Sequence, residues 1–370
     1  MKIIKVTSFY SPVTGGMETH MLNESKELIK LGHQVSIYTS NSKRKGKLNS
    51  GKTIEDKIEI NRFKTWFRLS YFTPFFPGVF LKSIFDNYDV LHSHSYRQTH
   101  NLTIIIAKLR NKKAILSTHW PEYPEELRSR FMNFFIPIFD KTLGKLILKF
   151  ADHIIVQSEQ EKQWLINKFK IKEDKIKIIE PGIEEKYLKK INPGNFKTKF
   201  KIKNRFILSL GRIHPSKGID KLITIAPKIN ATIVIAGSGE YLNKLKEKAD
   251  GIKNIIFTGR VTEEEKIEGI KDCEIYVTTS NYEAFGITLI EAMAQGKPVI
   301  GSNVGGIPET IGNGGLIFNK DNLEELIKKI NLLLKDKKLR NSLGNNGLKK
   351  AKELTWPKIA KRISKVYISK

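Results

Sequence analysis

Short apolar runs typical of buried strands alternate with longer amphipathic stretches along most of this 370-residue chain. Such alternation predicts parallel sheets with helices on both faces. The pattern occurs twice, and a polar, lysine-rich stretch separates the two halves. In the first half, the predicted strands are Ile3–Thr7, Gln34–Thr39, Val90–His94, Ala114–Thr118 and His153–Gln157. In the second half, they are Phe206–Leu210, Thr232–Ala236, Asn254–Thr258, Ile275–Thr279 and Pro298–Gly301.

The two halves predict two α/β domains, which also suits the length of the chain, since one core rarely serves so many residues. We place the first domain at residues 1–185, a connection at 186–204 and the second domain at 205–354. Ligands of open parallel sheets bind at the carboxyl ends of the strands. Two such domains facing each other would therefore enclose one deep cleft. The helices predicted in the second domain are Ile219–Ile229, Glu240–Ala249, Glu263–Ile270, Ala284–Gln295 and Leu323–Leu334.

The chain carries 65 basic and 38 acidic residues, which gives a formal net charge of +27 at pH 7. A field of this sign favours a polyanionic partner, such as nucleic acid, an anionic membrane or a phosphorylated substrate. The excess is densest between Ser40 and Leu69. A generally lysine-rich composition with solvated charges explains the same number, so the charge alone does not select a partner.

The remaining composition predicts a cytoplasmic protein. With Cys273 as its one cysteine, the chain can form neither an internal disulfide nor a thiolate zinc cluster. No apolar run reaches the ~18 residues of a membrane span, because the most apolar segment, Phe131–Phe150, is interrupted by Pro137, Asp140 and lysines. The first residues run directly into a strand and carry no signal-peptide pattern.

The strongest local signal is the stretch 280–294, SNYEAFGITLIEAMA, which follows a predicted strand and continues as an apolar helix. Glu283 and Glu291 would lie roughly 12 Å apart if the residues between them were all helical. One carboxylate would then bind the sugar and the other the ribose of an extended sugar nucleotide. The amides of Phe285, Gly286 and Ile287, in the first helical turn, would bind phosphate. A capped helix with one surface glutamate is the alternative, although the apolar neighbours of Glu291 disfavour it.

A second signal is the turn LGRIHPSKG at 210–218, where Arg212 and Lys217 follow the first strand of the second domain. A guanidinium and an ammonium suit the oxygens of a diphosphate. They would also stabilise the charge that grows on the leaving nucleotide, in place of a metal. Two solvated cations in a basic protein are the alternative interpretation.

Glycines follow two predicted strands, where a tight turn would let the backbone approach a ligand. Gly15 and Gly16 follow the first strand, where paired glycines permit positive φ angles and a close approach of the backbone to a ligand. Gly237 opens a similar turn in the second domain. No G-x-G-x-x-G pattern follows an early strand, so a nicotinamide dehydrogenase loses its main support.

Histidines occur at the ends of two predicted strands. His92 and His94 would share a strand face, but no carboxylate or thiol clusters with them in the sequence, so we predict no metal site. His119 is the better candidate for a catalytic or sugar-contacting group, and a purely structural histidine is the alternative for each of the three. The chain also has no Asp-x-Asp pair, the usual metal anchor in the other large class of sugar-nucleotide enzymes.

Together these motifs suggest a family. In order and spacing, GG, HxH, THW, GRxxxxKG, GSG, FTGRV, EAFGITLIEAMAQGKPVI and VGGIPE resemble the retaining glycosyltransferases of family GT4. The resemblance runs from Met1 to about Ile311 and is closest after Ser209. It implies the GT-B fold, with two Rossmann-like parallel-sheet domains facing each other across a deep cleft. It also implies that the C-terminal segment 355–370 crosses back onto the first domain.

The resemblance further implies roles for single residues. His119 would lie beside the transferred sugar, and Glu283 would bind the sugar hydroxyls. Arg212 and Lys217 would hold the diphosphate, and Glu291 would bind the ribose. The remaining donor-binding residues would be Gly15, Gly16, Gly237, Gly259, Arg260, Val261, Phe285, Gly286 and Ile287.

Such enzymes resemble same-face catalysts, in which a phosphate oxygen of the donor accepts the proton of the acceptor, and neither glutamate here is placed as a nucleophile. We therefore predict a retaining, metal-independent transferase that needs no cofactor. It would move a hexose from a UDP- or GDP-linked donor to a lipid-linked or saccharide acceptor. The family pattern is not fully kept, because Ser216 stands where a second cation would precede Lys217. Phosphate contact would then rest on Arg212 and Lys217.

Two other functions fit parts of the sequence. A sugar-nucleotide epimerase or a glucan synthase would use the same fold, and an epimerase would change its donor with no acceptor present. A polyanion-binding or nucleic-acid-binding protein would suit the net charge. However, Glu283 and Glu291 beside the proposed phosphate loop would repel a nucleic acid.

The segment 61–85, NRFKTWFRLSYFTPFFPGVFLKSIF, predicts a peripheral contact with the inner face of a membrane. Aromatic rings favour the headgroup region, and cations favour anionic lipid. The alternative is that the rings pack in the first core or form an acceptor pocket. The rings are Trp66, Phe67, Tyr71, Phe72, Phe75, Phe76 and Phe80, and the cations are Arg62, Lys64, Arg68 and Lys82.

Overall fold

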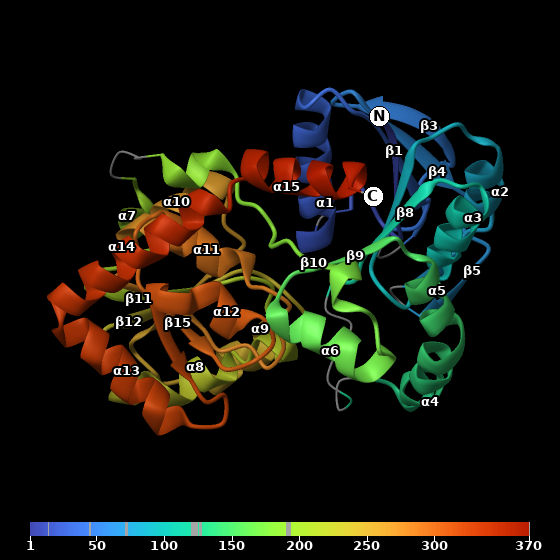
Figure 1. Ribbon diagram of the computed structural model, residues 1–370. Coiled ribbons are helices and arrows are strands. Elements are labelled where there is room, and N and C mark those ends of the chain that lie inside the picture. The colour runs from blue at the N-terminus through green and yellow to red at the C-terminus, as the bar shows by residue number, and fades with distance from the viewer. Residues whose placement is uncertain are drawn as a thin grey trace. The chain divides into compact units, whose positions relative to one another are not determined.

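The computed structural model describes residues 1–13, 15–43, 46–70, 73–119, 125, 128–189 and 194–369 (Figure 1). It divides into two compact units, Met1–Gly182 with Trp356–Lys370, and Ile183–Thr355. The predicted connection 186–204 therefore falls within the second unit. The reason is local packing, since Phe196 is buried and its ring stacks on that of Phe206, with 6.0 Å between centroids.

The first unit contains an eight-stranded sheet in the order β10-β9-β8-β7-β1-β2-β4-β3. All neighbours run parallel except β3, which is antiparallel to β4. Every strand predicted in this half is present, and β3, β4 and β10 are additional. The strands are β1 (Lys2–Thr7), β2 (Gln34–Ser40), β3 (Gly51–Glu55), β4 (Ile58–Phe63), β7 (Val90–His94), β8 (Lys113–Ser117), β9 (His153–Val156) and β10 (Ile176–Ile178).

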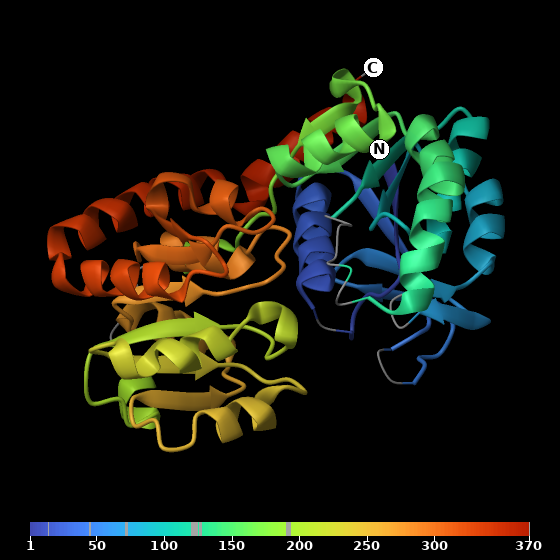
Figure 2. The ribbon, with the colours of Figure 1, turned by 90° about the horizontal axis from the view of Figure 1, so that it is seen from below.

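Helices cover both faces of this sheet, with α1 on one side and α5 on the other (Figure 2). Alternation along β1 separates the two faces. Ile4 and Val6 enter the main apolar core with residues of α2, α3, α5 and α6, whereas Lys5 faces Glu24 of α1. Helix α15 packs on α1, so the C-terminal segment belongs to the first unit. The helices are α1 (Gly16–Lys30), α2 (Gly78–Phe85), α3 (Thr103–Leu109), α4 (Arg130–Phe139), α5 (Lys145–Phe150), α6 (Glu159–Phe169) and α15 (Trp356–Ile368).

The aromatic segment 61–85 does not form one lipid-facing surface. Phe76 is buried in the core, and Arg62 is buried and bonded to Glu55, so neither can face lipid. Trp66 and Phe67 are exposed on the hairpin of β5 (Phe67–Ser70) and β6 (Thr73–Phe75). The predicted contacts at positions 71 and 72 lie outside the described residues. The expectation is therefore wrong for Phe76 and Arg62, and a membrane contact of the exposed residues Trp66 and Phe67 stays a prediction.

The second unit is built on a six-stranded parallel sheet in the order β13-β12-β11-β14-β15-β16. Every strand predicted in this half is present, and β16 is additional. The strands are β11 (Phe206–Leu210), β12 (Thr232–Ala236), β13 (Ile255–Gly259), β14 (Ile275–Thr278), β15 (Val299–Ser302) and β16 (Gly315–Phe318). The helices are α7 (Phe196–Lys199), α8 (Asp220–Ile225), α9 (Leu242–Lys248), α10 (Glu263–Asp272), α11 (Ile287–Ala294), α12 (Ile307–Ile311), α13 (Leu323–Lys335) and α14 (Lys337–Glu353).

Helix α11 begins three residues later than predicted. Gly286, at its N-cap, has a φ of 90°, a left-handed value that a helix interior does not accommodate. In the part of the chain that the structure describes, no helix is long and apolar enough to span a bilayer.

Candidate functional site

In the second unit, the loops after β11, β12 and β13 are joined through their backbones at the carboxyl ends of the strands. The amide of Ile213 donates to the carbonyl of Ser238 at 2.9 Å, and the amide of Gly237 donates to the carbonyl of Gly259 at 2.8 Å. The predicted motifs GR, GSG and FTGRV thus lie side by side. This is the edge of the sheet at which ligands of such folds bind.

Gly237 allows these loops to approach so closely. Its φ is 142°, and a Cβ there would lie 1.8 Å from the carbonyl oxygen of Gly211. The tight turn predicted at this position is therefore present, and glycine is required for it. Arg212 and Arg260 are exposed on the two neighbouring loops, and Val261 is half-buried. The backbone thus presents two guanidinium groups at this edge of the second unit.

The turn that carries Lys217 is fixed to the loop that carries Glu283. The carbonyl of Ser216 accepts hydrogen bonds from the amides of Asn281 at 2.8 Å and Tyr282 at 3.2 Å. The Lys217 ammonium forms an ion pair with the Glu283 carboxylate. The structure therefore brings together the two strongest motifs of the sequence. Their direct pairing was not predicted.

The loop before α11 differs from the predicted first helical turn. Phe285 is buried and precedes the helix, and its carbonyl accepts the hydroxyl of Thr310 at 2.6 Å. Gly286 is the N-cap and Ile287 is the first helical residue. Phe285 and Gly286 therefore do not offer helical amides as expected. The 12 Å separation worked out for Glu283 and Glu291 no longer applies, because three of the seven residues between them, Ala284 to Gly286, precede the helix.

Glu291 lies within α11 and is almost completely buried. Its Oε1 is 2.7 Å from Nζ of Lys266. The same Nζ lies 4.9 Å from the centroid of the Tyr187 ring. Burial raises the pKa of Glu291, and the charge and hydrogen bond of Lys266 oppose that rise. The other oxygen, Oε2, has no hydrogen-bond partner among the described residues. One carboxylate oxygen is thus held by lysine, and the other is buried near the Tyr187 hydroxyl, which also lowers the pKa of Glu291.

Lys266 was not among the predicted site residues. It lies on α10 in the sequence EEEKIEGIKD, where any lysine resembles a solvated charge. Only the contact between α10 and α11 reveals its role. The one feature of the sequence that pointed to Lys266 was that its polar helix directly follows the FTGRV motif.

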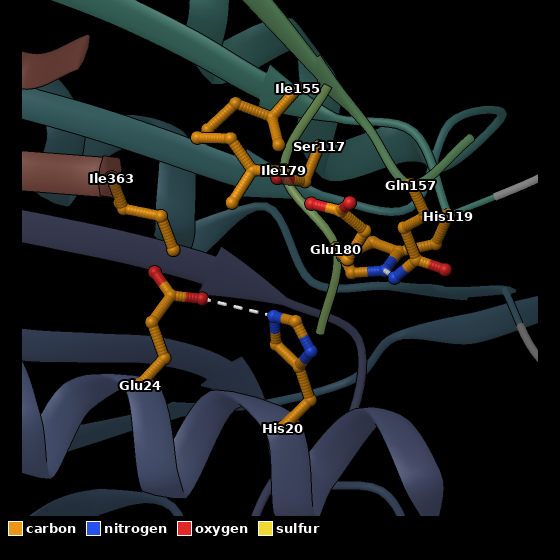
Figure 3. A pocket seen from close by; sticks show the side chains of 9 residues that line it. All are labelled: His20, Glu24, Ser117, His119, Ile155, Gln157, Ile179, Glu180 and Ile363. Atoms are coloured by element: carbon orange, nitrogen blue, oxygen red, sulfur yellow. Dashed lines mark hydrogen bonds and ion pairs between the residues drawn. The ribbon is translucent and has the colours of Figure 1, made fainter. Parts of the chain in front are cut away.

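The first unit contains a buried polar cluster between α1 and the sheet. Lys5 Nζ is 2.9 Å from Glu24 Oε1. The His20 ring lies 3.1 Å from Glu24 Oε2 (Figure 3). Burial by itself would raise the pKa of Glu24, but the Lys5 ammonium and the bond to His20 outweigh it, so the pKa is lowered. Burial likewise lowers the pKa of Lys5. Glu24 therefore remains a carboxylate and Lys5 is its main counter-charge.

His119 borders a small cavity beside this cluster. The amide of Gln157 donates to Nδ1 at 3.0 Å, so Nε2 carries the proton and donates to His94 at 3.1 Å. Burial lowers the pKa of His119 well below its ordinary value, which keeps the ring neutral. Both ring nitrogens are thus occupied. A contact between this imidazole and a sugar would require Gln157 or His94 to move away.

The expectation that no carboxylate clusters with His92 and His94 was wrong. Glu24, His92 and His94 each offer a ligand atom, and these atoms lie within 4.8 Å of one another. The carboxylate comes from α1, far away in the sequence. Lys5 already neutralises it, and both nitrogens of His92 are bonded, to Tyr367 and Ser117 at 2.7 Å each. These residues form a structural network that ties α15 to the sheet.

Gly15 and Gly16 do not use the positive φ angles that glycine permits. Gly15 is extended, with a φ of 179°, and Gly16 is the first residue of α1. A Cβ on Gly16 would meet nothing within 4 Å, so the space beside it is open. The start of α1 therefore leaves room for a ligand without a special backbone conformation.

Two Rossmann-like units, with cations and carboxylates at one sheet edge of the second, characterise a nucleotide-sugar-dependent glycosyltransferase. The family model for glycosyl transferases group 1 matches residues 193–350, and that for glycosyltransferase family 4 matches residues 14–187. The chain belongs to the GT4-type glycosyltransferases. The predicted family and the predicted enzyme class are thus confirmed.

Curated relatives match nearly the whole chain. An uncharacterized glycosyltransferase of Methanocaldococcus jannaschii is 28% identical over 99% of this chain and 98% of the relative. The phosphatidylinositol N-acetylglucosaminyltransferase GPI3 subunit of Saccharomyces cerevisiae is 25% identical over 99% of this chain and 82% of the relative. The alpha-monoglucosyldiacylglycerol synthase of Streptococcus pneumoniae is 26% identical over 81% of this chain and 70% of the relative.

Solved structures support the predicted GT-B fold. The Anabaena protein HepE in complex with UDP-glucose is similar with a TM-score of 0.76, at 19% identity and 100% coverage of both chains. The sucrose-phosphate synthase of Thermosynechococcus elongatus is similar with a TM-score of 0.75, at 20% identity, over 99% of this chain and 98% of that one.

Proposed function

We propose that this glycosyltransferase moves a hexose from a UDP- or GDP-linked donor, with retention of configuration, to a lipid-linked or saccharide acceptor. The observation that carries the proposal is the arrangement in the second unit. Several charged side chains follow, or lie beside, the carboxyl ends of the parallel strands. They are Arg212, the Lys217–Glu283 ion pair, and Glu291 with one oxygen bonded to Lys266.

In this proposal, the donor replaces contacts that the protein now makes to itself. Lys217 would leave Glu283 for the diphosphate, and the freed carboxylate would accept the hydroxyls of the sugar. A buried, charge-assisted contact of this kind contributes more than an ordinary hydrogen bond. The free oxygen of Glu291 would accept the ribose hydroxyls while Lys266 keeps the carboxylate charged.

We propose that the transfer needs no metal. Arg212 and Lys217 would stabilise the charge that develops on the leaving diphosphate, which is the task that a divalent ion performs in other enzymes. Retention would follow if the departing phosphate oxygen takes the acceptor proton on the same face. In that proton balance, the acceptor hydroxyl loses its proton to the leaving group, and no protein carboxylate forms a bond to the sugar.

Two relatives favour a lipid acceptor. Their names specify sugar transfer to phosphatidylinositol in one case and a glucosylated diacylglycerol in the other. The part that the first unit takes in acceptor binding stays a prediction, as does the place of His119 beside the transferred sugar.

A donor screen with product analysis tests the proposal. Purified protein is incubated with common UDP-, GDP- and ADP-hexoses, with and without extracted lipid acceptors, in the presence of EDTA. We expect release of one nucleoside diphosphate and a glycosylated product. A change in the donor sugar without any acceptor would instead indicate an epimerase. Loss of activity in EDTA that a divalent ion restores would refute the metal-free mechanism.

A further inference from the structure

Helix α4 of the first unit presents an apolar face that nothing in the described chain covers. No residue of this helix is buried. Phe131, Phe134, Phe135 and Ile138 follow the spacing i, i+3, i+4, i+7, which places them on one side of a helix. Their exposed fractions are 56%, 66%, 45% and 47%. Figure 1 shows α4 at the outer edge of the first unit.

The exposed apolar line continues beyond α4. A π-helical turn at Asp140–Gly144 joins α4 to α5, and Leu143 and Leu146 are exposed there by 45% and 40%. On α5, by contrast, Ile147 and Leu148 are buried in the core. The segment is therefore anchored at its C-terminal end, and its N-terminal part carries the exposed rings. Contiguous apolar surface of this kind marks an interaction site.

The charges around this face are mostly positive. Arg130, Lys141, Lys145 and Lys149 are all exposed. Asp140 is the one acidic residue between positions 128 and 150, and it is buried and paired with Arg97 at 2.6 Å and Lys168 at 2.9 Å. Glu125 is exposed beside the start of α4, where its carbonyl accepts a hydrogen bond from Asn133 at 3.2 Å. The face thus offers aromatic rings and four exposed cations, with the carboxylate of Glu125 near its N-terminal end.

We propose that this α4 face, defined as Phe131, Phe134, Phe135, Ile138, Leu143 and Leu146, docks the protein on an anionic lipid bilayer. Amphipathic helices with bulky apolar residues and flanking Lys or Arg lie in the plane of the interface, with the apolar side below the headgroups. The flanking cations then meet the negative surface of the bilayer. A second copy of the chain suits the face less well, because each copy carries a net charge of +27 and the two would repel each other. The inference rests on the proposed function only for the reason why the protein would dock, namely to reach a lipid acceptor. Docking itself needs no acceptor.

Vesicle co-sedimentation with the full chain tests the proposal. Phosphatidylglycerol-containing vesicles should bind the wild-type protein at low salt, and binding should weaken as salt rises. The variant Phe131→Gln/Phe134→Gln/Phe135→Gln should bind at least about 100-fold more weakly, since each buried ring accounts for roughly tenfold. Glutamine keeps the helix propensity, and circular dichroism checks the fold. Phe85→Gln, on α2 with an exposed fraction of 79%, is the matched control and should bind like the wild type.

The contribution of the cations to vesicle binding is tested with two further triple variants. Lys141→Ser/Lys145→Ser/Lys149→Ser should lose binding, whereas Lys244→Ser/Lys246→Ser/Lys248→Ser, with the same loss of charge on exposed α9 residues, should lose much less. Equal losses in the two variants would show that net charge alone attracts the protein, and would overturn a specific α4 surface. A further overturning result is vesicle binding that Trp66→Gln/Phe67→Gln abolishes and the α4 variant does not.

A depth probe separates docking from self-association and from catalysis. Because Cys273 is buried, an environment-sensitive fluorophore can be attached selectively at Phe134→Cys. On vesicles its emission should shift to the blue. A concentration-dependent dimer without any shift on vesicles would make a second copy the occupant and refute docking. A wild-type protein that transfers sugar to detergent-dispersed acceptor and binds no vesicle would refute docking alone, while one that docks and transfers nothing would refute the proposed function alone.

Discussion

The Lys266–Glu291 pair allows a sharp test of the donor site. The change is Lys266→Met, which removes the ammonium and keeps most of the aliphatic stem. The side chains of Lys266 and Glu291 are exposed by 16% and 8%, and Nζ lies 2.7 Å from Oε1. Removing one partner of a buried pair costs about 3–5 kcal/mol if the other stays charged. Protonation of the carboxyl relieves that penalty, so the pKa of Glu291 should rise further in the variant.

A protonated Glu291 is a poorer acceptor for the ribose hydroxyls. A hydrogen bond to a charged group contributes about 1.5–3 kcal/mol, so nucleoside diphosphate affinity should fall by about 10- to 100-fold at neutral pH. The sign of the pH dependence follows from the raised pKa. The carboxylate is lost as pH falls through that pKa, so affinity in the variant should increase with pH across the neutral range, more steeply than in the wild type.

The assay is isothermal titration calorimetry of UDP and GDP across that pH range. Lys266→Arg should restore affinity, because it restores the charge. Lys228→Met, which removes one partner of the exposed Lys228–Glu324 pair, is the matched control and should leave affinity unchanged. Stability offers a second readout. An acid with a raised folded-state pKa binds protons better when folded, so the stability deficit of Lys266→Met should shrink as pH falls. A loss of affinity that is the same at every pH would refute the role assigned to Lys266.

Three further predictions concern the same edge of the second unit. Arg212→Ala and Lys217→Ala should each lower kcat by about 100-fold with an unchanged melting temperature, and near-normal kcat in both would remove the diphosphate assignment. Glu283→Gln should lower kcat yet leave free-nucleotide affinity equal or higher, because it releases Lys217. Glu291→Gln should mainly weaken nucleotide binding. Equal effects of the two variants on nucleotide affinity would mean that the roles are wrong. Gly237→Ala should destabilise the second unit by at least about 1–3 kcal/mol in urea titrations. Gly251→Ala, also at positive φ but with nothing within 4 Å of its Cβ, should destabilise it less. Similar urea midpoints for the two variants would contradict the close approach of the loops.

The central strands could be predicted because each is buried on both faces. Runs such as Phe206–Leu210 and Thr232–Ala236 are apolar at all but one position each, and the structure reproduces their predicted bounds. The strands that were not predicted lack this signal. Strand β3 is largely exposed, and the four residues of β16 are mostly half-buried beside glycines, so neither shows an apolar run of useful length.

The site could be predicted where single motifs carry it, and not where long-range contacts do. Arg212, Lys217 and Gly237 follow strands directly, so their common edge followed from the parallel sheet. Lys266 and Glu24 join the clusters through helix packing, which no local pattern records.

Exposure was equally invisible in the sequence. The segment Phe131–Phe150 was recognised as the most apolar stretch, but only the structure shows that Ile147 and Leu148 enter the core while Phe134 faces outward. The aromatic segment 61–85 led to the opposite error, because Phe76 was expected at a membrane surface and is buried in the core.

The anomeric configuration of the product tests the central claim most directly. With the donor identified by the screen and a lipid or saccharide acceptor, proton NMR in the presence of EDTA records the coupling constant of the new anomeric proton. The account predicts an α-linked product from an α-linked nucleotide sugar, formed at the same rate with and without the chelator. A β-linked product, or turnover that depends on an added divalent ion, would contradict it.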